Sequence, residues 1–217
     1  MGRGSAKVGL MRFTGRSVPD FYDQCAPAPH EHIAHLRLDD LDSAERTALW
    51  NYKLDIVDGE SHCFDLNHRL RNGLALSAAQ QATCDGLDSV FARCPRVIKP
   101  ITIYRGEFTT EFLGGAKVGD KLTCPQFWST AHTALRTEQF TRDGGAILKL
   151  QLPADMAVYD IDTLKPGHNS EQELLLPRGI TWQVLKLRQI PEAETPKFLA
   201  RRFTFGIQEV HLVAIVP

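Results

Sequence analysis

The chain has 217 residues, of which 43% are hydrophobic and 24% are charged, values that are typical of a folded globular protein and exclude a disordered one. This length is enough for one domain with a full core and is short for two domains. The formal net charge of −1 argues against a general nucleic-acid-binding or membrane-binding surface.

The cysteines and the N-terminal residues indicate the cellular compartment in which the protein acts. The five cysteines contain no CxxC pair, and their odd number favours a reducing cytosol over a disulfide framework. No window approaches the roughly 18 apolar residues of a membrane span, and the first residues lack the apolar core of a signal peptide. We therefore expect no membrane partner. The opening "MGRGSA" has Ala6 where a myristoylation signal needs Ser or Thr.

Residues 1–30 are rich in Gly, Pro, Arg and Ser and show no apolar period, which predicts a loosely structured N-terminal arm. Residues 31–217 then form a single domain. The segment "HEHIAH" does not match a metalloprotease motif, because His30 and His35 are five positions apart and point in different directions on a helix. We expect no metal site.

Three helices are expected in the first half of the chain, at residues 41–52, 62–73 and 76–94. Asp42 or Ser43 can cap the first helix, with Glu45 nearby. Gly73 can end the second helix, which carries the apolar residues Phe64, Leu66 and Leu70.

After Pro100 the pattern changes to short β-branched and aromatic runs separated by Gly, Pro and Asp. The runs cover residues 101–106, 121–130, 146–152, 156–161, 171–176, 180–190 and 208–216. A helical first half followed by a strand-rich second half indicates an α+β fold. No GxGxxG lies between a strand and a helix, so a Rossmann dinucleotide site is excluded.

Two of these runs end in candidate functional residues. Arg105 closes the run "IYRG", where its guanidinium could fork onto a phosphate or carboxylate, or form a structural ion pair. Gly106 follows it and would let a ligand approach the backbone. Ser129 and Thr130 close the run "FWST" and could either cap a helical turn or orient a carboxylate on a neighbouring strand.

A third run begins with a pair of carboxylates, Glu171 and Glu173, two residues apart. Alternate residues of a strand share a face, so the two side chains would point the same way, about 6.6 Å apart. Charges of this kind can protect an edge strand from aggregation. The three leucines that follow, Leu174 to Leu176, instead indicate a strand buried on both faces, so the pair suggests the rim of a cleft.

In this order, an Arg–Gly strand end, a Ser–Thr strand end 24 residues later (129 − 105) and a Glu-x-Glu motif resemble the arginine-directed mono-ADP-ribosyltransferases of the Arg–Ser–Glu class. The resemblance covers roughly residues 38 to 217 and includes "NHRLR" at 67–71 and "ILKLQLP" at 147–153. The family usually has Ser-Thr-Ser in the second motif, where this chain has Ala131. Without a signal peptide or paired cysteines, the chain resembles the bacterial toxin and effector branch.

The resemblance implies two small packed β-sheets with a cleft for NAD, the co-substrate. Arg105 would hold the pyrophosphate, Ser129 would hydrogen-bond Glu173, and Glu173 would contact the 2′-hydroxyl of the nicotinamide ribose. An anion there stabilises the oxocarbenium-like centre that forms when nicotinamide leaves. Glu171 would bind and deprotonate the acceptor, an arginine of a target protein.

Further contacts are implied around these residues. Gly106 and Gln126 would line the NAD site, Phe140 would stack on nicotinamide or occupy the core, and Arg142 could meet a phosphate. The polar segment 162–169 would meet the target protein. The resemblance also implies a secreted bacterial effector that acts inside a target cell. A nucleic-acid acceptor is disfavoured by the net charge and by Glu171. The alternatives are an NAD glycohydrolase and a degenerate member that only binds.

Overall fold

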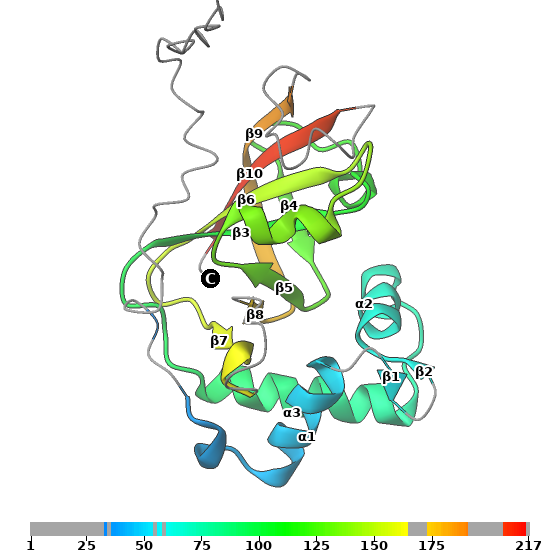
Figure 1. Ribbon diagram of the computed structural model, residues 1–217, viewed down its shortest axis with the longest axis vertical. Coiled ribbons are helices and arrows are strands. Elements are labelled where there is room, and N and C mark those ends of the chain that lie inside the picture. Colours follow the sequence, from blue (N-terminus) through cyan, green and yellow to red (C-terminus); the bar gives the residue numbers. More distant parts are fainter. Residues whose placement is uncertain are drawn as a thin grey trace, which may run out of the picture.

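A computed structural model describes residues 33, 36–53, 56–57, 60–164, 173–190 and 206–215. Three α-helices precede a mixed eight-stranded sheet, which confirms the α+β expectation (Figure 1). The predicted arm at residues 1–30 lies outside the described residues, and so does Glu171. Within the described ranges, no helix is long and apolar enough to cross a membrane.

The helices begin and end close to the predicted positions, at α1 (Ser43–Lys53), α2 (Cys63–Asn72) and α3 (Ala78–Arg93). Asp42 caps α1: its carboxylate accepts from the Glu45 backbone N–H at 2.8 Å, and its own N–H donates to the Glu45 carboxylate at 2.9 Å. Gly73 ends α2 with a left-handed φ of 63°. Of the apolar residues expected on this helix, Phe64 is 56% exposed while Leu66 is buried. Two residues apart on a helix, they point in nearly opposite directions, so only one can face the core.

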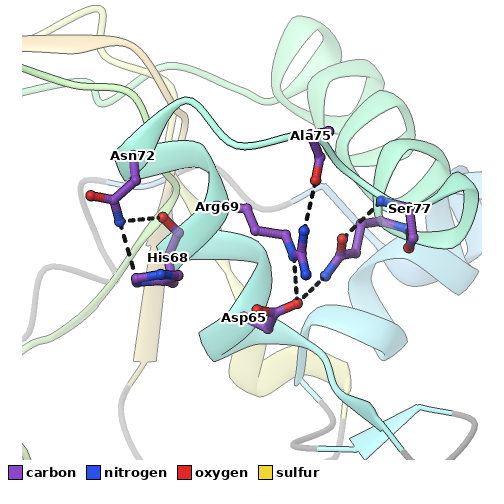
Figure 2. Close-up of polar contacts among 7 residues, drawn as sticks. Asp65, His68, Arg69, Asn72, Ala75 and Ser77 are labelled. Carbon is purple, nitrogen blue, oxygen red and sulfur yellow. Dashed lines mark hydrogen bonds and ion pairs between the residues drawn. The ribbon is translucent and has the colours of Figure 1, made fainter.

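A polar network fastens α2 to the start of α3 (Figure 2). The Asp65 carboxylate accepts from Arg69 Nε at 2.8 Å and from Gln80 Nε2 at 2.7 Å. Arg69 also donates to the carbonyl of Ala75 at 2.8 Å. These contacts fix the direction of α2, which matters for the site because α2 carries Asn67.

The strands agree with the predicted runs, except that residues 121–130 divide into two strands and the run at 156–161 shortens to a two-residue strand. They are β3 (Ile101–Glu107), β4 (Lys121–Cys124), β5 (Trp128–Ala131), β6 (Ala146–Leu152), β7 (Tyr159–Asp160), β8 (Glu173–Leu176), β9 (Ile180–Ile190) and β10 (Ile207–Ile215), beside a small hairpin of β1 (Ile56–Val57) and β2 (Glu60–Ser61). The order in the large sheet is β4-β9-β10-β6-β3-β5-β8-β7. Only β6 and β10 pair in parallel among these described strands.

The large sheet folds over on itself at the junction of β3 and β5. These strands are joined in register at Tyr104 and Ala131. Trp128 of β5 stacks on Trp182 of β9 with ring centroids 5.4 Å apart, although β3, β6 and β10 lie between them in the sheet order. The two sheets expected from the resemblance are therefore two halves of one continuous sheet, with a core between them. The helices cover the β5–β8 half, where a second core contains Leu49, Leu87, Phe127 and Leu175, among others (Figure 1).

Candidate active site

Three of the predicted residues, Arg105, Ser129 and Glu173, lie on neighbouring strands of the sheet, β3, β5 and β8. Ala131 of β5 pairs with Tyr104 of β3 on one side and with Glu173 on the other. The fold therefore brings together strand residues that are far apart in the sequence, although Arg105 and Ser129 lie within β3 and β5 and only Glu173 is at a strand end. The third position of the Ser-Thr-Ser motif, here Ala131, is a buried pairing position between them.

Arg105 is held by two partners. Its Nε donates to the Glu107 carboxylate at 2.7 Å, and its Nη1 donates to the backbone carbonyl of Ser129 at 2.5 Å. The guanidinium also lies 5.5 Å from the centroid of the Trp128 ring. Burial disfavours the charge, but the attraction of Glu107 and its hydrogen bond outweigh burial and leave the pKa of Arg105 raised. Arg105 is thus a fixed cation, and the ion-pair alternative for it is realised with Glu107.

Ser129 contacts the helical layer. Its hydroxyl donates to the Tyr52 hydroxyl at 3.4 Å. Tyr52 in turn accepts from Asn67 Nδ2 at 2.9 Å, and Asn67 Oδ1 accepts from the Phe127 backbone N–H at 3.1 Å. Burial raises the pKa of Tyr52 to about 12, so this residue stays a neutral phenol. The motif "NHRLR" contains Asn67, but the sequence does not indicate the contacts that Tyr52 and Asn67 make in the site.

Glu173 is the first residue of β8. Its backbone N–H donates to the carboxylate of Asp162 at 3.2 Å, and Asp162 belongs to the 3₁₀ turn η6 (Ile161–Leu164). Its own carboxylate forms an ion pair with Lys53, the last residue of α1. Lys53 had no signal in the sequence, because the contact depends on how α1 packs against the sheet.

The expectation for Gly106 needs correction. A Cβ at this position would lie 2.5 Å from the carbonyl oxygen of Thr137 and 2.9 Å from the carbonyl carbon of Phe140, both in the 3₁₀ helix η5 (Ala134–Phe140). The space beside the Gly106 Cα is therefore filled by η5 and is not open to a ligand. Glycine is required there because the two backbones approach closely.

Gln126 is buried and connects other residues of the site. With its amide oxygen turned toward the nearby donors, it accepts from Trp128 Nε1 at 2.8 Å and from Arg71 Nε at 3.3 Å. Gln126 is thus a buried support for the Arg71 guanidinium of "NHRLR" and not an open wall of the site.

Phe140 ends η5 and is 40% exposed, so the alternative core position is wrong for it. An exposed ring remains able to stack on a planar ligand. The Arg142 guanidinium lies 4.4 Å from the centroid of the Phe108 ring, as a cation–π contact.

In the parts of the chain that the structure describes, no group of three His, Cys, Asp or Glu side chains is arranged to hold a metal ion. Cys84, Cys94 and Cys124 are buried free thiols. Burial raises the pKa of Cys84 to about 11 and that of Cys94 and Cys124 to about 12. These three thiols therefore stay protonated and unreactive at neutral pH.

Comparison with known proteins identifies the class that the fold and the strand-end residues indicate. A model of the ADP-ribosyltransferase exoenzyme family matches residues 35–201, most of the chain. The chain belongs to this family, and the predicted resemblance is confirmed. The reaction is the transfer of ADP-ribose from NAD, the co-substrate, to an acceptor.

Solved structures with the same fold include bacterial toxins. Exoenzyme S from Pseudomonas aeruginosa, solved with human 14-3-3 protein beta and carba-NAD, is 17% identical at a TM-score of 0.60, over 80% of this chain and 74% of that one. Plx2a, an ADP-ribosyltransferase toxin from Paenibacillus larvae, is 13% identical at 0.61, over 82% and 89%. C3stau2 from S. aureus, solved with NAD, is 16% identical at 0.59, over 81% and 88%. At these identities the likeness establishes the fold. No curated protein matches the sequence significantly.

Proposed function

We propose that this protein transfers ADP-ribose from NAD to the guanidinium of an arginine on a target protein, and that residues 31–217 form the catalytic unit. The observation that carries the proposal is that Arg105, Ser129 and Glu173 lie on three strands that are neighbours in the sheet, β3, β5 and β8. A cation can hold the pyrophosphate of a dinucleotide, and a carboxylate can stabilise the positive charge that develops when its nicotinamide bond breaks.

The donor half of the reaction uses Arg105 and Glu173. Arg105 is oriented by Glu107 and by the Ser129 carbonyl, so its guanidinium needs little reorganisation to receive the pyrophosphate of NAD. Glu173 places a negative charge beside the anomeric carbon, where positive charge develops as the nicotinamide bond breaks. The leaving nicotinamide is already cationic, so it needs no general acid, unlike the leaving group of a glycosidase.

The acceptor half assigns Glu171, two residues before Glu173, as the group that binds and deprotonates arginine. A guanidinium has a pKa above about 12 and must lose a proton to act as a nucleophile. The surroundings of β8 support a cationic acceptor: Asp162 accepts from the Glu173 N–H, and the Asp162 N–H donates to the Asp160 carboxylate at 3.2 Å. This negative corner attracts a guanidinium and repels the phosphates of a nucleic acid.

The setting we propose is that of a secreted bacterial effector acting in the reducing interior of a target cell. Membership of the exoenzyme family and the fold shared with toxins such as Plx2a support this setting. The exoenzyme S structure contains a second protein, and a protein acceptor fits that precedent.

The test compares nicotinamide release with label incorporation into protein arginine, using labelled NAD, cell lysate and one enzyme preparation. In Glu171→Gln the charge that attracts and deprotonates the acceptor is lost, so labelling should fall by roughly a hundredfold, within the usual range for a general base. Slow nicotinamide release into water should survive, because Glu173 is intact. Glu111→Gln changes an exposed glutamate away from these strands and serves as the matched control.

Other outcomes separate the alternatives. A parallel fall of both rates in Glu171→Gln would contradict the division of roles between the two glutamates. Full labelling by this variant would mean that the acceptor is not arginine. A wild-type enzyme that releases nicotinamide but labels no protein would be an NAD glycohydrolase, and one that binds NAD without releasing nicotinamide would be a binding module.

A further inference from the structure

An ion pair joins the end of α1 to the start of β8, between Lys53 Nζ and Glu173 Oε2, which are 120 positions apart in the sequence. The Lys53 side chain is 22% exposed and that of Glu173 is 13% exposed, so water is largely kept from both. Exposed ion pairs contribute little because solvent screens them. A shielded pair has more effect, since removal of one partner leaves an uncompensated charge.

The helix that presents Lys53 is held firmly at its C-terminal end. The preceding residue, Tyr52, accepts a hydrogen bond from Asn67 at 2.9 Å, and its ring packs edge-on against Phe127 with centroids 6.0 Å apart. A cation is also favoured at the last turn of a helix, where the helix dipole is negative. Lys53 therefore reaches Glu173 from a fixed backbone.

The surroundings of Glu173 explain why a cation is needed. The carboxylate of Asp162 lies against the Glu173 backbone N–H, and the buried Asp160 accepts from the Asp162 N–H. Neighbouring negative charges repel the Glu173 carboxylate and push its side chain away. The Lys53 ammonium offsets this repulsion.

We propose that Lys53 is a positioning residue for the donor reaction: its ammonium holds the Glu173 carboxylate directed into the site before NAD binds. This inference rests on the proposed role of Glu173 in breaking the nicotinamide bond. An ammonium is a compact charge, and here it meets Oε2 of the carboxylate. A guanidinium would tend to fork across both oxygens.

The experiment measures steady-state nicotinamide release from NAD by full-length Lys53→Met, Lys53→Arg and wild type. Lys53→Met keeps most of the length of the side chain but removes the charge, and should lower kcat roughly ten- to a hundredfold, the range expected when one charge-assisted hydrogen bond is lost. The KM for NAD should change less than about twofold, because Arg105 and not Lys53 holds the pyrophosphate. Lys53→Arg should recover at least part of the loss in kcat. Lys99→Met, an exposed lysine far from β8 in the sequence, is the matched control.

Glu173→Gln in the same assay separates this inference from the proposed function. If Glu173→Gln is inactive while Lys53→Met has the kcat of wild type, the role of Lys53 is refuted and the proposed function stands. If Glu173→Gln is active, the proposed role of Glu173 is wrong, and the inference about Lys53 is wrong with it. A merely structural Lys53 would give a lower thermal midpoint without rescue of kcat by Lys53→Arg, which also refutes positioning. In a Glu173→Gln background, Lys53→Met should cause no further loss.

Discussion

Glu209 and Glu173 both lie on strands and both form ion pairs. The cations that pair with Glu209 lie on the neighbouring strand, whereas the cation that pairs with Glu173 lies on a helix. Glu209 lies on β10 and is 1% exposed. It accepts from Lys186 at 2.9 Å and from Arg188 Nε and Nη2 at 2.8 and 2.6 Å, and His211 lies 2.5 Å away. Glu173 is paired with Lys53, which lies in the helical layer.

The two ion pairs differ in the part of the fold that brings the cations to the carboxylate. Arg188 is opposite Glu209 in the β9–β10 ladder, and Lys186 is opposite His211, so the register of two antiparallel strands assembles the whole cluster. The pair of Glu173 with Lys53 depends instead on the packing of α1 against the sheet. A carboxylate held by its own ladder contributes to the stability of the sheet. Glu173 lies between two layers, on a strand that neighbours the strand of Ser129, and it is the carboxylate that we propose acts on NAD.

The largest expected effect is on activity. Glu173→Gln should reduce both nicotinamide release and arginine labelling on the order of a hundredfold or more, because only the charge beside the anomeric carbon is lost. Its free energy of unfolding should change much less than that of a Glu209 variant. Chromatographic measurement of nicotinamide, with urea unfolding of the same preparation, tests both statements. Near-normal nicotinamide release would show that Glu173 does not act in the reaction, and the proposed difference in role between Glu173 and Glu209 would then be wrong.

For Glu209 we expect the reverse of the Glu173 result, namely a loss of stability with little loss of activity. Glu209→Gln should lower the free energy of unfolding by about 2–3 kcal/mol, because buried charge-assisted hydrogen bonds from β9 lose their acceptor charge. The rate per folded molecule should remain close to wild type. Urea unfolding measures the first and nicotinamide release the second, with Glu111→Gln as the exposed control. Unchanged stability would show that the ladder, not the ion cluster, holds β9 to β10.

Arg105 sharpens the comparison because it has a structural partner, Glu107, and a proposed ligand. Arg105→Lys keeps the charge, but an ammonium cannot reach Glu107, the Ser129 carbonyl and a pyrophosphate with the fork of a guanidinium. We expect the Kd for NAD to rise about tenfold, equivalent to about 1.4 kcal/mol. Calorimetry with NAD measures it, beside Arg96→Lys as an exposed control. An unchanged Kd would mean that Arg105 has a structural role only, like the residues of the Glu209 cluster.

The smallest effect concerns the pH dependence of the Glu209 cluster. Burial lowers the pKa of His211 below its ordinary 6.5, with Lys186 and Lys149 adding to this and Glu209 opposing it. The unfolded chain therefore binds a proton at this residue before the folded chain does, and stability falls as the pH drops below 6.5. In His211→Gln this decline should be shallower between pH 7 and pH 5. An identical slope for wild type and variant in urea unfolding would exclude His211 as its source.

The sequence by itself determined the elements whose signals are local. The Asp42–Glu45 cap, the left-handed Gly73 and the β-branched runs each act within a few residues, so helix ends and strands were predicted closely. The motif residues at strand ends were also readable, since their types and order carry the family resemblance. The sequence did not distinguish exposed Phe64 from buried Leu66, because an apolar residue type does not say which side of a short helix packs against the core.

Only the tertiary structure decided which distant residues meet. The adjacency of β3, β5 and β8 results from crossovers in the sheet, and no local preference specifies them. The contact of Tyr52 with Ser129, the pair of Lys53 with Glu173 and the filling of space beside Gly106 by η5 arise from the packing of one layer or turn on another. The physical reason is that such contacts are selected by the shape and burial of whole surfaces, which single residues and their spacing do not encode.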